Sequence, residues 1–182
     1  MAPPTKSGLY VQSIIYAVSG TAITGGAATQ LLVGQDTQNY ISLYGNSLSD
    51  YTGVLNTGAT TTGIAWAGGS GTPNYEIFGT GWATGGVQLS VAANGGPVGT
   101  AVTLTGSGPY VMTYTWATNP LSITGTTLTG IYGCIIYNHS ATSPVTKPMI
   151  LQLCFGTAYN TVAGTFGITP SGSGLAALTL TA

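Results

Sequence analysis

The chain has 182 residues, a length that suits one domain, or one domain with an ordered arm or a small insertion. Charged residues make up only 3% of it, two Lys and three acidic residues, whereas an ordinary soluble domain carries about a quarter. This composition argues against nucleic-acid binding, which needs clustered Lys and Arg, and no apolar run approaches the roughly 18 residues of a membrane-spanning helix. So neutral a surface indicates a protein that associates with others in an assembly.

Residues 1–35 are predicted to form an N-terminal arm or first strand. Residues 9–17 are rich in strand-forming side chains, and no long apolar core follows Lys6, so we expect no signal peptide and no secretion by a classical route. An extended segment of this kind can add a strand to the exposed sheet edge of a neighbour. Leu9, Tyr10 and Val11 are therefore candidate interface residues.

Short apolar and aromatic runs, separated by Gly, Thr and Pro, fill the rest of the chain. They predict an all-β fold, an antiparallel β-sandwich or jelly-roll-like domain over residues 36–182, with helices nearly absent. Residues 52–74 show little periodicity and predict a long Gly-rich loop or insertion. The runs at 128–137 and 149–155 are almost continuously apolar and are expected to be the central strands. The expected strands are 9–17, 40–44, 87–91, 98–104, 110–116, 128–137, 149–155, 165–168 and 176–181.

Residues that could carry chemistry are few. A general base needs an oriented partner, so the isolated His139 is interpreted as a turn histidine that faces solvent. Asp36, Asp50 and Glu76 are interpreted as solvated loop acids, and one His with two Cys does not supply the ligands of a zinc site. We therefore predict no catalytic residues, no metal and no cofactor, and hence no enzyme.

The two cysteines, Cys134 and Cys154, each lie inside an apolar run, where a thiol behaves as a small hydrophobic group. They would face each other if the two runs formed a hairpin, so a disulfide stays open as an alternative. A reducing compartment favours the thiols.

Aromatic side chains are the group most suited to binding. Trp116 lies within an expected strand and is predicted to be core, and Trp82 is predicted to pack against a sheet. Trp66 lies in the Gly-rich loop, which makes it the candidate for an exposed contact. Residues 79–81 and 85–86 contain the glycines of turns or bulges, because they lack the Lys and the following helix of a phosphate-binding loop.

Four motifs resemble, in the same order, a pattern found in a family of small virion proteins of tailed bacteriophages. Residues 40–44 are similar to the family's early strand, often written "KVALY". Residues 75–89 match an acidic residue followed by "G-x-G-aromatic-x-x-G-G-x-x-L". The remaining similarities, to "W…A.GALIYN" and "P.IAYIDFG … G.FTI", lie in residues 114–116 with 130–138 and in residues 148–155 with 164–168.

Members of this family look like head decoration or minor head proteins with β-rich folds and no enzymatic activity. The resemblance implies a decoration protein on the capsid exterior, assembled in the bacterial host cytoplasm. Its partners would be the major capsid protein and other copies of itself, with a trimer at three-fold lattice positions as one arrangement. Two alternatives stay open. One is a head-fibre or tail-associated receptor- or glycan-binding β-module that uses Trp66 and tyrosines as stacking platforms, and the other is a shell-building capsid protein.

Overall fold

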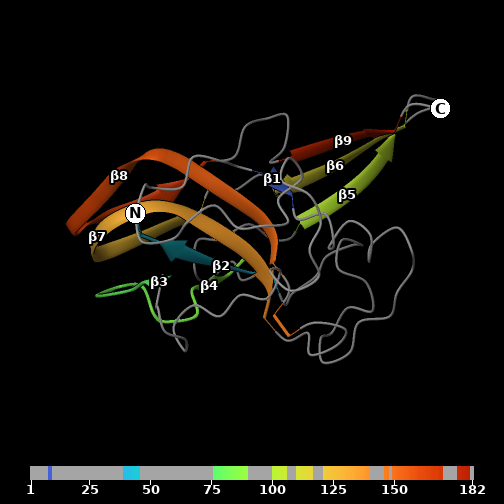
Figure 1. Cartoon of the computed structure of the whole chain (residues 1–182). Coiled ribbons are helices and arrows are strands. Elements are labelled where there is room, and N and C mark those ends of the chain that lie inside the picture. The colour runs from blue at the N-terminus through green and yellow to red at the C-terminus, as the bar shows by residue number, and fades with distance from the viewer. Residues whose placement is uncertain are drawn as a thin grey trace.

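The part of the chain that the computed structural model describes is all-β (Figure 1). Every regular element that it describes is a strand, and all the strand pairs are antiparallel. In these residues no helix is present that is long and apolar enough to cross a membrane. The residues that the structure describes are 8–9, 39–45, 76–89, 100–105, 110–116, 121–139, 146–147, 149–169 and 176–180.

The larger sheet has six strands. Five of them follow the order β1-β8-β7-β2-β3, and the sixth, β4, also pairs with β2. Strands β7 and β8 therefore lie in its interior, as the continuous apolar runs predicted. The strands of this sheet are β1 (Gly8–Leu9), β2 (Asn39–Tyr44), β3 (Glu76–Ile77), β4 (Val87–Gln88), β7 (Leu121–Asn138) and β8 (Met149–Ile168).

The smaller sheet has three strands in the order β5-β6-β9. Its middle strand coincides with the predicted strand at residues 110–116, in which larger side chains alternate with Val and Thr, as expected of a half-buried strand. The structure describes the backbone of these strands but not their side chains, so the predicted core position of Trp116 lies outside what it describes. Its strands are β5 (Thr100–Thr105), β6 (Tyr110–Trp116) and β9 (Ala176–Leu180).

Strands β7 and β8 form a long two-stranded ribbon that bends strongly over the core (Figure 1). The prediction of a separate strand at 165–168 is wrong, because these residues are the end of β8. The ribbon bends where its register shifts. Between the pairs Ile131↔Tyr159 and Gly133↔Cys154, only Tyr132 on β7 lies opposite residues 155–158 on β8. Such bulges sharpen strand twist and bending, so a sequence with interrupted periodicity can still form one continuous strand.

A cluster of buried apolar side chains runs across β2, β7 and β8, and both faces of these strands carry buried residues, such as Tyr44 and Ile135 on the face opposite Ile41. Ile41 pairs with Ile136, which in turn pairs with Leu151, and these three side chains are fully or almost fully buried. Because cross-strand partners point to the same face of a sheet, they form one apolar row. The other buried apolar residues of this core are Leu43, Trp82, Val87, Leu89, Leu121, Leu128, Ile131, Cys134, Ile150 and Phe166.

The two cysteines lie on adjacent central strands, as a hairpin requires, but on opposite faces. Cys134 pairs with Leu153, whereas Cys154 pairs with Gly133. Since neighbouring residues of a strand alternate between faces, the two sulfur atoms point apart. No disulfide links them.

Candidate functional site

The motif at residues 76–89 folds as a compact excursion from the edge of β2. The chain pairs with β2 at Ile77, leaves it, and pairs with it again at Val87. Between these points Gly79 and Trp82 exchange backbone hydrogen bonds of 3.0 Å, which closes a tight turn. Gly81 has a φ of 78° in that turn, a conformation that glycine adopts without steric cost. The glycines of the motif therefore form turns, as predicted.

This turn carries Trp82 into the core. Its side chain is almost fully buried, and its ring meets that of Phe166 edge to face at 5.5 Å. The predicted packing of Trp82 against the sheet is thus confirmed. The turn itself is joined to β7, because Thr127 donates its N–H to the carbonyl of Thr80 (3.0 Å).

Glu76 is buried, which makes the prediction of a solvated loop acid wrong. Its Oε1 accepts a hydrogen bond from the hydroxyl of Ser42 (2.6 Å) and another from the N–H of Gly85 (2.7 Å). Tyr137 in turn donates its hydroxyl to the carbonyl of Gly85 (2.7 Å). The carboxylate of Glu76 therefore links Gly85, near the end of the excursion, to Ser42 of β2. The number of charged residues in the sequence could not reveal this role.

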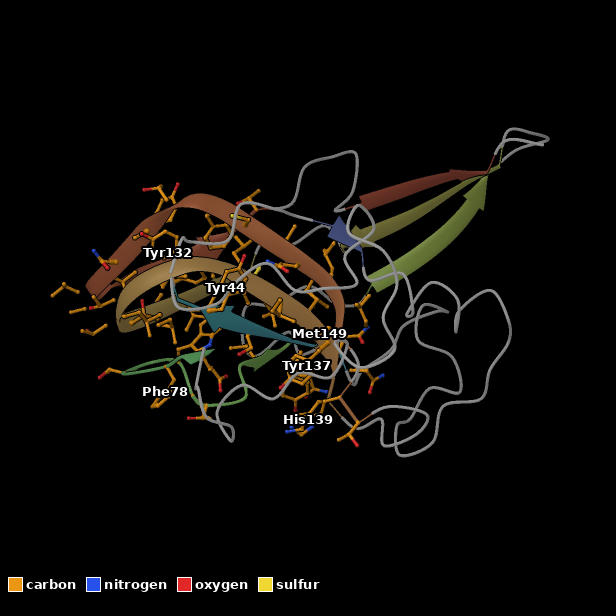
Figure 2. All side chains as sticks on the ribbon, in the orientation of Figure 1. Tyr44, Phe78, Tyr132, Tyr137, His139 and Met149 are labelled. Carbon is orange, nitrogen blue, oxygen red and sulfur yellow. The ribbon has the colours of Figure 1, made fainter. Side chains whose placement is uncertain are left out.

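His139 follows the last residue of β7, yet its ring is half-buried rather than open to solvent. It stacks on the ring of Tyr40, with the ring centroids 4.5 Å apart. The ring of Tyr137 lies close to it as well, with a centroid distance of 6.1 Å (Figure 2). Burial lowers the pKa of His139, and the positive charge of Lys147 lowers it further. The aromatic cluster around the imidazole therefore disfavours its protonated form.

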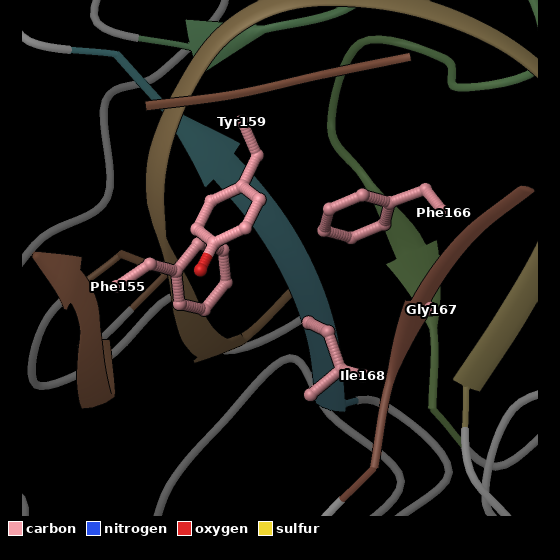
Figure 3. Close-up of a pocket in the computed structure, with 5 residues that line it drawn as sticks. All are labelled: Phe155, Tyr159, Phe166, Gly167 and Ile168. Carbon is pink, nitrogen blue, oxygen red and sulfur yellow. The ribbon is translucent and has the colours of Figure 1, made fainter. Parts of the chain in front are cut away.

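An aromatic pocket of about 350 Å³ opens between two parts of β8 (Figure 3). Phe155 and Tyr159 come from the bulged middle of the strand, and Phe166, Gly167 and Ile168 come from its end. The rings of the first two meet edge to face at 5.8 Å. This pocket exists because the strand bends, and its volume lies at the small end of the range of ligand sites.

The bulge explains how Phe155 reaches this position. It is the first of the extra residues of β8, and Gly156 after it has a φ of 75°. A left-handed residue at a bulge turns the chain sharply and re-aims the adjacent side chain. Phe155 is consequently placed beside Tyr159 rather than in the regular alternation of the strand.

Among the described residues, three large apolar side chains are exposed. Tyr159 at the mouth of the pocket is 50% exposed, Phe78 in the excursion 51% and Val162 on β8 83%. Single exposed apolar residues are common on proteins, but an aromatic ring that lines a pocket combines contact area with rigidity.

A second hollow, of about 370 Å³, lies beside the excursion. Its lining residues are Tyr40, Gly81, Ala83, Gly86, Val87, Gln88 and Ile123. Within the described part of the chain no three His, Cys, Asp or Glu residues lie close enough together to hold a metal ion.

The predicted interface residues are placed only in part. Leu9 belongs to β1 and pairs with Leu151 of β8, so this piece of the N-terminal arm is a strand within the chain's own sheet. Tyr10, Val11 and Trp66 lie outside the described residues, as do Asp36, Asp50, the loop at 52–74 and the boundary at residue 35. The sequence did not single out Phe155 and Tyr159, whose juxtaposition depends on the register shift in β8.

Comparisons with protein-family models, with curated proteins and with solved structures found no match to this chain. The similarity to tailed-phage virion proteins therefore stays a prediction from its motifs.

Proposed function

We propose that this protein decorates the head of a tailed bacteriophage, where it binds the outer face of the major capsid protein lattice and performs no catalysis. The observation that carries this proposal is an exposed aromatic pocket, with Tyr159 at its mouth, on a chain of which only 3% of the residues are charged. Contacts made by such a surface are apolar contacts and backbone or hydroxyl hydrogen bonds rather than ion pairs. The motif similarities supply the class of partner.

The proposed mechanism is cementing. A protein that binds one state of the shell stabilises that state according to its free concentration relative to its dissociation constant. Repetition over a lattice, or a trimer at each three-fold position, strengthens the effect through avidity. We further propose that the two sheets belong to one sandwich-like or jelly-roll-like domain.

The test is the copy number of the protein in purified virions, measured by quantitative mass spectrometry against the major capsid protein. Decoration predicts a ratio near one or a simple fraction of it. A handful of copies would assign the protein to a fibre or the tail, and its absence from the particle would refute the proposal.

A second candidate is a receptor- or glycan-binding β-module. The half-exposed ring of Tyr159 beside Phe155 favours it, because aromatic faces form stacking platforms for sugar rings. Binding to a glycan array that Tyr159→Ala abolishes would establish this function instead.

A further inference from the structure

The second hollow, beside the excursion, is separate from the aromatic pocket of β8. Among the described residues, the two share no lining residue. Three parts of the larger sheet build the hollow: Tyr40 of β2, Ile123 of β7, and residues 81–88 of the excursion and β4. A ligand bound here would add to attachment at the capsid surface and would not depend on it.

The wall that the excursion contributes is made of very small residues. Gly81 and Gly86 have φ values of 78° and 76°, which favour glycine, and a Cβ at Gly86 would also collide with the carbonyl of Ile41. The third small residue of this wall is Ala83. Because no side chain larger than a methyl group stands at these three positions, a ligand can approach the backbone closely.

This wall is held in place by hydrogen bonds. Gly86 donates its N–H to the carbonyl of Ala83 (3.1 Å). The preceding residue, Gly85, donates its N–H to Glu76 and accepts a hydrogen bond from the hydroxyl of Tyr137. A wall that is already ordered loses little conformational freedom when a ligand binds.

The opposite wall includes Tyr40, whose position is also fixed. As a residue of β2 it pairs with Tyr137 on one side and with Gln88 on the other. Its ring stacks on that of His139, with an angle of 26° between the two ring planes. An aromatic ring held in this way is suited to stack against the apolar face of a sugar ring.

The remaining lining limits the chemical class of the ligand. Val87 and Ile123 are aliphatic, and Gln88 brings a carboxamide, a neutral group that can both donate and accept hydrogen bonds. None of the described lining residues is charged. A charged ligand would therefore lose hydration without gaining an opposite charge, which is costly. A neutral sugar combines an apolar C–H face with hydroxyl groups and fits this lining.

We propose that this hollow binds a neutral hexopyranose unit of a glycan. Its apolar face lies against Tyr40, and its hydroxyls lie toward Gln88 and the backbone of the excursion. The volume of about 370 Å³ is at the small end of the range of ligand sites, which suits a terminal sugar unit.

The test titrates methyl glycosides of glucose, galactose, mannose and N-acetylglucosamine into the full-length protein and follows them by NMR. We expect at least one of them to shift the amide signals of residues 81–88 and the ring signals of Tyr40. The methyl glycosides of glucuronic acid and glucosamine carry a charge and should bind at least about tenfold more weakly.

Two pairs of variants test the site itself. Ala83→Leu fills the hollow from an exposed position and should weaken binding by at least about tenfold, whereas Thr84→Leu makes the same kind of change at the next exposed residue, outside the described lining, and should not. Tyr40→Phe keeps the ring and should retain most of the binding. Tyr40→Leu removes the ring and should lose it.

The proposal is overturned if no neutral glycoside shifts these signals, if the two leucine variants of the excursion bind equally, or if Tyr40→Leu binds as the wild type does. Equal binding of the charged glycosides would also overturn it. Sugar binding that Tyr159→Ala abolishes and Ala83→Leu leaves intact would place the glycan in the pocket of β8 instead. If the Tyr40 variants do not fold, the comparison of Ala83→Leu with Thr84→Leu decides, because both positions are exposed.

Discussion

The phenol ring of Tyr44 lies across Gly133, its partner on β7, and its hydroxyl donates a hydrogen bond to the carbonyl of Leu153 on β8 (2.9 Å). One side chain therefore spans three adjacent strands. Burial raises the pKa of Tyr44 far above its usual value of 10.0, so the hydroxyl keeps its proton and remains a donor. This crossing requires glycine, because a Cβ at Gly133 would collide with both the Tyr44 hydroxyl and the Leu153 carbonyl.

Gly133→Ala should therefore destabilise the fold severely, by about 3 kcal/mol or more, since the clash involves backbone as well as a side chain. The control is Gly130→Ala on the same strand. Its φ of 74° makes alanine strained there, but a Cβ meets no atom within 4 Å, so we expect only about 1–2 kcal/mol. Urea denaturation measures both. Equal losses in the two variants would show that the Tyr44 crossing does not constrain residue 133.

The sequence alone predicts much of this fold. Alternation identified β6 to the residue, and continuous apolar runs identified β7 and β8 as central. These elements are predictable because their periodicity follows directly from which faces are buried. The full lengths of β7 and β8 were not predictable, because bulges such as the one after Phe155 break the alternation on which the prediction depends.

The candidate site was less predictable for the same reason. Phe155 and Tyr159 come together through a register shift. No local sequence pattern indicates which side chain changes direction at such a shift. Glu76 was misassigned because an acidic residue among turn formers is usually solvated. Its burial depends on two donors, Ser42 and Gly85, of which the first lies far away in the sequence.

Glu76 itself provides the second prediction. Glu76→Ala leaves the Ser42 hydroxyl and the Gly85 N–H without the acceptor they now share, which should cost about 2–4 kcal/mol. Glu76→Gln keeps an acceptor oxygen at the same position and should cost less. Thermal or urea unfolding of the two variants checks this order. A glutamine variant as unstable as the alanine variant would mean that the shared acceptor oxygen is not what fastens the excursion.

The cysteines should differ in reactivity. Cys134 is fully buried, and burial raises the pKa of its thiol well above its usual value of 9.0, which disfavours the reactive thiolate. Cys154 is only partly buried. In the folded protein, Cys134→Ser should retain the fast reaction with a thiol reagent and Cys154→Ser should lose it, while both variants react fully in denaturant. Fast labelling of Cys134 in the folded Cys154→Ser variant would contradict the burial described.

The lowered pKa of His139 predicts that the stability of the fold depends on pH. Burial and then the charge of Lys147 lower its pKa below 6.5, so the folded chain binds the proton less readily than the unfolded chain. The contribution of neutral His139 is fully present above about pH 6.5 and is lost as the pH falls below that value toward the folded pKa. The melting temperature should accordingly decrease between about pH 7.5 and about pH 5.

His139→Phe keeps an aromatic ring against Tyr40 but cannot take up a proton. Its melting temperature should therefore vary less over the same pH interval. An unchanged slope in this variant would assign the pH dependence to another group.

Attachment to capsids should depend little on salt. At about 1 M salt the Debye length falls to about 3 Å, so ion pairs between exposed groups are almost fully screened, whereas apolar contacts and strand pairing persist. The dissociation constant of the wild type should change by less than about tenfold between about 50 mM and about 1 M salt, as measured by sedimentation of capsids with bound protein. Replacing a basic residue, as in Lys147→Gln, should leave attachment unchanged at both concentrations. Loss of most binding at high salt would show that a charged partner surface, and not the uncharged pocket on β8, carries the interaction.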